Sequence, residues 1–243
     1  MAWAYPLDEV ARAIHAAPTG TALRVQSVST DTRTIRPGDL FFALRGDRFD
    51  GDTFAAQAFA KGAVAAVTHT PQEGGPCLVV RDTLAALQQF AAYHRRAHDV
   101  PVFALTGSCG KTSSKDLIAA LLATRYRVVK TLGNLNNDIG CPLSVLRIDG
   151  ETDRAVIEMG ANHAGEIAGL CEIALPTEVA ITLIAPAHLE GFGTIENVAR
   201  AKGEILAASV PPKTFYVNAD DPYCVHLAEG FHGEKVLFGR RGD

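Results

Sequence analysis

The segment Val102-Phe-Ala-Leu-Thr-Gly-Ser-Cys-Gly-Lys-Thr112 decides the architecture of the larger part of this 243-residue chain. An apolar strand runs into a turn bracketed by Gly107 and Gly110, and Lys111 stands at the start of a predicted helix. The glycines let successive backbone N–H groups point at phosphate oxygens, while the helix N-terminus and Lys111 add positive charge. Leu105 occupies the usual place of a first glycine, so the loop is a short variant. The order of strand, turn and helix favours phosphate binding over an incidental glycine turn.

Beyond this loop, apolar strands alternate with helical stretches. The predicted strands are 102–106, 128–130, 154–158, 179–184, 214–218 and 235–238. This alternation is typical of a parallel sheet covered by helices on both faces. Ligands bind such sheets beyond the carboxyl ends of the strands. The fold class is therefore α/β, with a P-loop-type parallel-sheet domain that binds nucleotide phosphates.

Upstream of the loop, the chain mixes shorter elements. A polar turn at Arg36-Pro-Gly-Asp39 follows an alternating stretch, and Asp52 or Thr53 and later Asp82 are candidate helix caps. The predicted helices cover 7–14, 52–61 and 82–97, and the predicted strands cover 25–33, 40–44, 63–67 and 78–80. Pro101 stops the last helix, which indicates a domain boundary. We expect a small mixed α/β N-terminal domain at 1–98, followed by the parallel-sheet domain at 99–243.

Composition narrows the class of protein. The chain has 23 basic and 27 acidic residues and a net charge of −4, so a nucleic-acid partner is not expected. No apolar run reaches the roughly 18 residues that span a bilayer, and no signal sequence is recognisable. Five cysteines without a Cys-x-x-Cys pair indicate reduced thiols. We therefore expect a cytoplasmic protein.

Three polar side chains lie near the predicted carboxyl ends of later strands or in a following helix. Glu158 ends a strand, His188 follows the next one, and Lys202 lies on a helix that begins near Ile195. Glu158 and His188 at one sheet edge would offer an oxygen and a nitrogen to Mg²⁺. Taken singly, each residue is as readily a surface acid, a loop histidine or a solvated cation.

Ordered motifs connect these residues to a family. The motifs are Thr30–Arg33, Pro37–Leu44, Thr106–Thr112, Gly133–Gly140, Val156–His163, Ala187–Gly193 and Ala201–Ile205. Together they strongly resemble the Mur ligases of peptidoglycan synthesis, over nearly the whole chain. The segments Gly-Asn-Leu-Asn-Asn-Asp, Gly-Ala-Asn-His and His-Leu-Glu-Gly-Phe-Gly favour the members that add a dipeptide over those that add earlier amino acids.

The resemblance implies an ATP-dependent amide ligase that joins D-alanyl-D-alanine to UDP-N-acetylmuramoyl-tripeptide through an acyl phosphate. It implies that ATP phosphates bind at Thr106, Gly107, Ser108, Cys109, Gly110, Lys111 and Thr112. It implies catalytic roles for Lys111, Glu158, His188 and Lys202, and Mg²⁺ ligation by Thr112, Glu158, His188 and Lys202. Lys202 falls on the family's carbamylated lysine, which carries CO₂. The implied substrate-binding residues are Ser29, Thr30, Asp31 and Arg33 at the UDP end, and Asn134 and Asn137 near the muramoyl peptide.

Three departures from the family pattern stand out. Leu183 replaces a usual asparagine ahead of His188, and Cys109 replaces a more common Ser, Asn or Thr. The third departure is length, because family members carry a C-terminal domain for the dipeptide. We therefore expect an N-terminal fragment that forms no product by itself, and a full-length protein that is a monomer.

Two alternatives stay open. One is a sister ligase that adds a single amino acid, such as the third peptide residue, or a folylpolyglutamate synthase. The other is a non-catalytic module that binds a UDP-sugar. Turnover with D-alanyl-D-alanine against single amino acids separates the enzymes, and separate titrations of UDP-muramoyl tripeptide and ATP identify a binding module.

Overall fold

The computed structural model describes residues 3–46 and 49–240 and divides the chain into two compact units, 1–96 and 97–243. This division lies two residues before the boundary expected from Pro101. No helix in the described part of the chain is long and apolar enough to cross a membrane. All five cysteines are described and carry free thiols.

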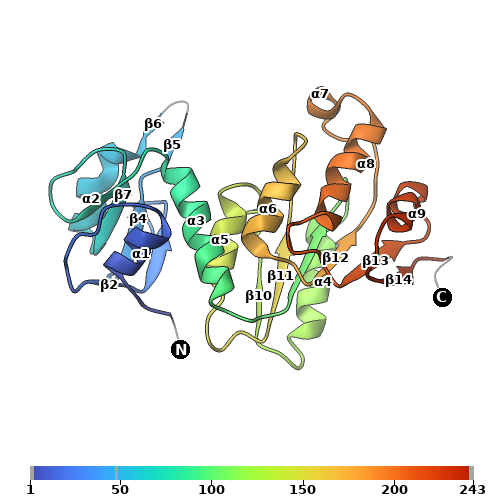
Figure 1. Cartoon of the computed structure of the whole chain (residues 1–243), viewed down its shortest axis with the longest axis horizontal. Coiled ribbons are helices and arrows are strands. Elements are labelled where there is room, and N and C mark those ends of the chain that lie inside the picture. The colour runs from blue at the N-terminus through green and yellow to red at the C-terminus, as the bar shows by residue number, and fades with distance from the viewer. Residues whose placement is uncertain (1–2, 47–48, 241–243) are drawn as a thin grey trace. The chain divides into compact units, whose positions relative to one another are not determined.

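The N-terminal unit is built on a four-stranded parallel sheet in the order β3-β4-β7-β8 (Figure 1). Its strands are β3 (Ser27–Ser29), β4 (Asp39–Phe42), β7 (Ala65–Thr68) and β8 (Cys77–Val79). Alternate β4 residues face opposite sides, so Phe41 packs with α2 (Ala55–Ala60), whereas α3 (Thr83–Arg96) contacts β4 and β7. The remaining elements are α1 (Leu7–Ala13), the antiparallel pair β1 (Tyr5–Pro6) and β2 (Arg24–Val25), and the antiparallel pair β5 (Arg45–Gly46) and β6 (Phe49–Asp50).

Two local predictions for this unit are wrong in detail. The single strand expected over 25–33 is two short strands in different sheets, because β2 pairs with β1 while β3 pairs with β4. Neither Asp52 nor Thr53 is the cap before α2. Asp50 accepts the Asp52 N–H at the start of the 3-10 helix η1 (Gly51–Phe54), and the Asp52 carboxylate binds His69 and Thr70 instead.

The second unit is built on a six-stranded parallel sheet in the order β10-β11-β9-β12-β13-β14. The strands are β9 (Val102–Thr106), β10 (Val128–Lys130), β11 (Arg154–Glu158), β12 (Glu178–Ile181), β13 (Thr214–Asn218) and β14 (Glu234–Phe238). Register places Glu158 beside Leu105 and Ile181 beside Thr106, so the polar segments after these strands meet at one edge. The chain passes to both sides of β9, which makes its carboxyl end the switch point where ligands bind.

Helices cover the two faces of this sheet unequally. Ala104, Ile157, Val179 and Phe215 are fully buried on one face, where α5 (Gly140–Val145) contacts β11 and α9 (Pro222–Glu229) contacts β13. The same layer includes α6 (Glu166–Ala174) and α8 (Ile195–Gly203), which contact each other. The opposite face carries α4 (Lys111–Leu122), packed on Leu105, Val156 and Ala180.

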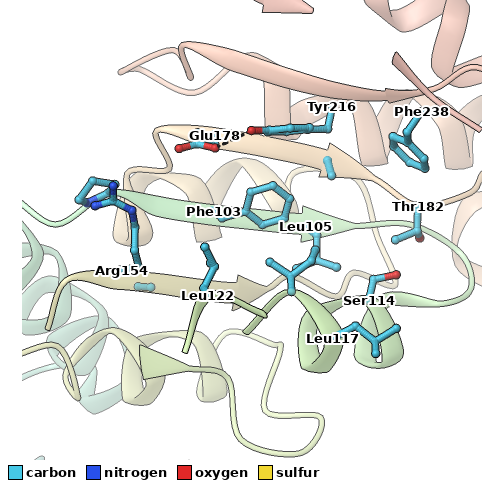
Figure 2. Close-up of a pocket in the computed structure, with 14 residues that line it drawn as sticks. Phe103, Leu105, Ser114, Leu117, Leu122, Arg154, Glu178, Thr182, Tyr216 and Phe238 are labelled. Atoms are coloured by element: carbon cyan, nitrogen blue, oxygen red, sulfur yellow. Dashed lines mark hydrogen bonds between the residues drawn. The ribbon is translucent and has the colours of Figure 1, made fainter. Parts of the chain in front are cut away.

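Helices lie on both faces of the sheet, as expected, but among the described residues α4 covers only part of its face. Beside α4 lies a groove of about 480 Å³, which Figure 2 shows extending across the strands. Phe103 and Tyr216 line it from β9 and β13, with Thr182 and Phe238 near the carboxyl ends of the strands. Among the described residues, α4 shields the β9–β11 side, whereas the side chains of β12 and β13 stay partly open.

Candidate functional site

The phosphate loop joins β9 to α4, as the sequence predicts. Gly107 and Gly110 adopt φ values of 142° and 82°, which favour glycine. A Cβ on Gly107 would stand 2.1 Å from the Thr182 hydroxyl oxygen, so the close approach of β12 also requires glycine. The Thr182 hydroxyl donates to the Cys109 carbonyl at 2.6 Å. Two separate constraints therefore hold the turn in a phosphate-loop conformation.

The hydroxyls of the predicted phosphate-binding residues Thr106 and Ser108 hold the loop in place. Thr106 is buried and its hydroxyl donates to the Met159 carbonyl at 2.8 Å. Ser108 donates its N–H to the Leu183 carbonyl at 2.7 Å and its hydroxyl to Ala185. Leu183 serves this contact through its backbone, so the replacement of the family's asparagine leaves the contact intact. Exposed Cys109 makes the contact with Thr182 through its backbone as well.

Lys111 and the helix that it begins supply the positive charge of the loop. The Lys111 ammonium donates to the Gly107 carbonyl at 2.8 Å, which folds the side chain back over the turn. The first N–H groups of α4 lack partners within the helix and carry its partial positive charge. This arrangement suits the phosphate groups of a nucleotide.

A buried carboxylate lies next to this helix N-terminus. Glu158 Oε1 accepts the Thr112 hydroxyl at 3.2 Å and the Asn136 amide at 2.7 Å. Its other oxygen, Oε2, is buried and has no hydrogen-bond partner among the described residues. Buried polar atoms are normally satisfied, so this oxygen is a vacant ligand for a cation. The residues present therefore fit an oxygen-ligated Mg²⁺ held by Glu158 and Thr112.

Lys115 is a further charge at this site that the sequence interpretation missed. It lies one turn after Lys111 on α4 and is 1% exposed. Its ammonium is 2.8 Å from the Gly133 carbonyl and 3.8 Å from Glu158 Oε2. The spacing of four residues, which places two helical side chains on one face, is the signal that could have identified it.

The asparagine segment between β10 and α5 contacts Glu158 through an unpredicted residue. Asn136 binds Glu158, whereas Asn137 caps the first turn of α5 by accepting the Gly140 N–H at 2.9 Å. Asn134 is exposed, and its carbonyl accepts the Asn136 N–H. A Cβ on Gly160 would stand 2.6 Å from Asn136 Oδ1, so that glycine admits the amide. Nothing in the sequence distinguishes half-buried Asn136 from its exposed neighbours Asn134 and Asn137.

Lys202 is buried, although lysine side chains are mostly exposed. Its side chain is 1% exposed, and its ammonium donates to the Ala161 carbonyl at 3.1 Å. It also lies 5.5 Å from the centre of the Phe192 ring. Burial, with a smaller contribution from the positive charge of Lys111, lowers the pKa of Lys202 to about 8. The amine is therefore partly neutral near that pH and can act as a nucleophile.

That His188 and Glu158 share a divalent cation stays a prediction. His188 is exposed in the segment after β12 and has a φ of 51°. The structure records no contact, among the described residues, between its imidazole and either Glu158 or Lys202. The strand before it, β12, ends at Ile181 instead of at residue 184 as predicted, because the Ile184 N–H donates to the buried Asp221 carboxylate and leaves the ladder.

The residues predicted to hold the UDP end lie directly after β3. Buried Ser29 donates its hydroxyl to the Asp31 carbonyl, and Thr30 is half-buried. Asp31 and Arg33 form an exposed ion pair of 2.7 Å. Hydrogen bonds from Arg33 lower the pKa of Asp31 to about 2. The loop is therefore stabilised by its own internal contacts. The Arg33 side chain is 86% exposed, so its guanidinium stays accessible to a ligand.

A second concave surface lies at the carboxyl edge of the same sheet. A cavity of about 470 Å³ is lined by Arg45, His69 and Arg81, which follow β4, β7 and β8. These three residues come directly after apolar strands, a signal that the sequence interpretation did not use. Two guanidinium groups and an imidazole suit a diphosphate.

Asp50, Asp52 and His69 near this cavity are close enough to bind a cation. Both Asp52 oxygens are already used, because they accept the His69 and Thr70 N–H groups. Burial opposes ionisation of Asp52, but hydrogen bonds from these two residues outweigh it and lower its pKa. We interpret the cluster as structural: the Asp52 carboxylate of η1 holds the His69–Thr70 segment that follows β7.

A parallel sheet that ends in a phosphate loop, with a buried carboxylate and an unpaired oxygen beside it, is typical of α/β proteins that bind nucleotide phosphates. Family models agree with this class. The Mur ligase middle domain matches residues 105–243, and the Mur ligase family catalytic domain matches residues 24–95. The chain belongs to the Mur ligase family.

Individual relatives support the same conclusion. UDP-N-acetylmuramoyl-tripeptide–D-alanyl-D-alanine ligase of Escherichia coli strain K12 is 46% identical over 203 residues, which cover 83% of this chain and 45% of that protein. A crystal structure of MurF from Acinetobacter baumannii has a TM-score of 0.90 at 34% identity, covering 99% of this chain and 55% of that one. MurF from Thermotoga maritima in complex with ADP has a TM-score of 0.76 at 31% identity, covering 89% and 51%. The chain spans about half the length of these relatives.

Proposed function

We propose that this chain forms the UDP-substrate and phosphate-handling parts of an ATP-dependent ligase that joins D-alanyl-D-alanine to UDP-N-acetylmuramoyl-tripeptide. The observation that carries the proposal is the phosphate loop next to Glu158, whose Oε2 is buried and vacant. The relatives named above support the choice of substrates. Because ATP and a UDP-linked precursor are consumed, we assign the protein to the cytoplasm and to cell-wall synthesis.

In this proposal the phosphate loop and Lys111 bind the ATP phosphates and neutralise the charge that develops on the transferred group. The tripeptide carboxylate attacks the γ-phosphorus, and ADP leaves with the electron pair of the broken bond. The dipeptide amine then attacks the acyl phosphate, and inorganic phosphate leaves. Thr112 and Glu158 would hold a Mg²⁺ ion, which would supply charge neutralisation for the phosphates. The chain's own contribution is to orient the reactants.

We further propose that Lys202 carries a CO₂-derived carbamate, which with His188 serves a second Mg²⁺. The lowered pKa of Lys202 supports this proposal, because only a neutral amine attacks CO₂. With ¹³C-labelled bicarbonate, a carbamate signal should appear and strengthen as the pH rises toward 8. Lys202→Ala should lose the signal, and exposed Lys130→Ala should keep it. A signal that survives in Lys202→Ala would assign the carbamate elsewhere.

The N-terminal unit is proposed to bind the UDP end of the precursor. Ser29, Thr30, Asp31 and Arg33 form one side after β3, and the cavity with Arg45 and Arg81 suits the diphosphate. Asn134 and Asn137 are proposed to lie near the muramoyl peptide. Calorimetric titration with UDP-N-acetylmuramoyl-tripeptide tests this assignment, and Arg81→Ala should weaken binding while exposed Arg96→Ala should not.

The experiment for the whole proposal measures nucleotide binding and ligation. Calorimetry should show that the protein binds Mg·ADP, and that Lys111→Ala weakens binding about 10- to 100-fold because one charge-assisted hydrogen bond is lost. Lys130→Ala, an exposed lysine paired with Asp116, is the control. In the natural full-length protein, ADP release should require both the tripeptide and D-alanyl-D-alanine. Equal turnover with a single amino acid would favour a sister ligase, and substrate binding without turnover would favour a binding module.

A further inference from the structure

The inner face of α4 carries a lysine that the proposed reaction does not use. Lys115 is fully buried, and its ammonium is 3.8 Å from the vacant Glu158 Oε2. Burying an ammonium or a carboxylate alone is costly, so each is expected to have a partner of opposite charge. The pair therefore neutralises the interior of the site in the nucleotide-free protein.

The geometry of this pair differs from that of an ordinary salt bridge. The Lys115 ammonium makes its 2.8 Å hydrogen bond to the Gly133 carbonyl, and its separation from Glu158 Oε2 is beyond hydrogen-bond distance. The ammonium thus balances the charge of the carboxylate without occupying its lone pairs. Glu158 Oε2 stays available to a metal ion, although its charge is already compensated.

The surrounding charges reinforce this effect. Lys115 brings one positive charge from α4 against the single buried carboxylate, and Lys111 lies one turn earlier on the same helix. Asp116 lies 3.5 Å from the Lys115 ammonium, but it is half exposed and pairs with Lys130 at 2.7 Å. Without nucleotide, the Lys115 charge therefore offsets that of Glu158 and weakens the attraction of the site for a divalent cation. When a nucleotide binds, its phosphates add negative charge to the site, and the site then attracts a divalent cation.

We propose that Lys115 is the resident counter-ion of the cation site, so that a divalent cation binds Glu158 only together with nucleotide phosphates. Lys115 is a positioning residue, because it acts through Glu158 and contacts no reacting atom. The inference rests on the proposed function in taking the nucleotide as ATP or ADP. Such a device prevents the buried carboxylate from trapping a metal ion before the nucleotide arrives.

The test measures Mn²⁺ binding by electron paramagnetic resonance, with and without ADP. The wild-type protein should bind Mn²⁺ weakly alone and much more tightly with ADP. Lys115→Met and Lys115→Gln should bind Mn²⁺ alone at least about tenfold more tightly than wild type, because a nearby positive charge is removed. Lys115→Arg, which keeps the charge, and Lys213→Met, which changes an exposed lysine of the same unit with no contact to Glu158 or Asp116, should behave like wild type.

The outcomes separate this inference from the proposed function. A gain of Mn²⁺ affinity that disappears in Lys115→Gln/Glu158→Gln supports the counter-ion, since structural damage would only weaken binding. Folded Lys115→Gln with unchanged Mn²⁺ affinity overturns it. If neither neutral variant folds, wild-type Mn²⁺ affinity that is independent of ADP overturns it. Failure of the wild type to bind ADP at all refutes the nucleotide function, while the Mn²⁺ comparison without ADP still decides the role of Lys115.

Discussion

The cation site depends on single atoms contributed from three parts of the chain. Glu158 ends β11, Thr112 begins α4, and Asn136 lies in the loop before α5. Gly160 completes the arrangement, because its missing side chain admits the Asn136 amide and its N–H donates to the Asn136 carbonyl at 2.8 Å. A substitution at Gly160 should therefore alter the position of Glu158 through Asn136 and leave the phosphate loop unchanged.

We expect Gly160→Ala to displace the Asn136 side chain and remove its hydrogen bond to Glu158. The clash is with the end of a side chain, so the loss of stability should be small, whereas Mg·ADP affinity should fall about three- to tenfold, as for one modest hydrogen bond. Calorimetry of Mg·ADP binding checks this. Gly169→Ala on α6, where a Cβ meets nothing, is the control. Unchanged affinity in Gly160→Ala would show that Asn136 does not orient Glu158.

At the scale of elements, the segment after β12 is held by the start of α9. Asn218 donates its side-chain amide to the Thr182 carbonyl at 2.8 Å. The buried Asp221 carboxylate accepts the Ile184 N–H at 2.6 Å and also caps α9 through the N–H groups of Tyr223 and Cys224. One carboxylate thus ends a strand, begins a helix and shapes the loop that leads to His188.

Asp221→Ala should destabilise the second unit by about 2 to 4 kcal/mol, since it removes a helix cap and leaves the Ile184 N–H buried without a partner. Urea unfolding followed by circular dichroism measures this loss. The neighbouring Asp220→Ala removes an exposed carboxylate and should cost less than about 1 kcal/mol. Equal effects of the two substitutions would contradict the role assigned to Asp221.

In the N-terminal unit, Asp52 makes the stability of the sheet depend on pH. Its folded pKa is lowered, so its stabilising effect is present above the ordinary carboxyl pKa and is lost as the pH falls through the folded value. Trp3, the single tryptophan of the chain, packs beside Phe90 and His94 and reports on the folding of this unit. Its fluorescence can therefore follow the acid transition.

We expect the urea midpoint reported by Trp3 to fall as the pH decreases below about 4. Asp52→Asn should cost about 1 to 3 kcal/mol at pH 7, because an amide cannot accept from all the N–H groups of His69 and Thr70. The variant should lose less stability than wild type between pH 7 and pH 3. Glu73→Gln, an exposed carboxylate of this unit, should follow wild type at every pH.

At the scale of the whole molecule, the groove beside α4 leaves apolar side chains exposed. Leu117 and Leu121, 66% and 72% exposed, extend it along the outer side of the helix. The edge strand β14 adds Val236, Leu237 and Phe238, which are also exposed. Open apolar faces and strand edges promote association between molecules.

Replacing Leu117 and Leu121 together with lysine should reduce self-association and lower the fluorescence of a bound apolar dye. Sedimentation velocity over a range of concentrations measures the first effect, and dye titration measures the second. Val225→Lys on α9, an apolar residue that is 41% exposed and does not line the groove, should change neither. Dye binding that is unaffected by the double substitution would place the exposed apolar surface elsewhere.

Several predicted elements match the structure residue for residue, and local chemistry explains why. The strands 102–106, 128–130, 154–158 and 214–218 each hold a short apolar run that ends at a polar residue, so nearby sequence suffices to delimit them. Asp82 caps α3 through the N–H groups of Leu84 and Ala85, as predicted. Where the predictions failed, at 25–33, at Asp52 and at 182–184, a partner distant in sequence decided the outcome.

The sequence by itself determined the phosphate loop, because the positions of Gly107, Gly110 and Lys111 set the backbone of the turn and the start of α4 locally. Only the tertiary structure decided that Asn136 holds Glu158, that Oε2 stays vacant, and that the Lys115 ammonium lies beside it. The reason is distance along the chain. Glu158 meets Asn136 across 22 residues and Thr112 across 46, so the direction of each side chain depends on how β9, β11 and their loops pack, and no local pattern encodes it.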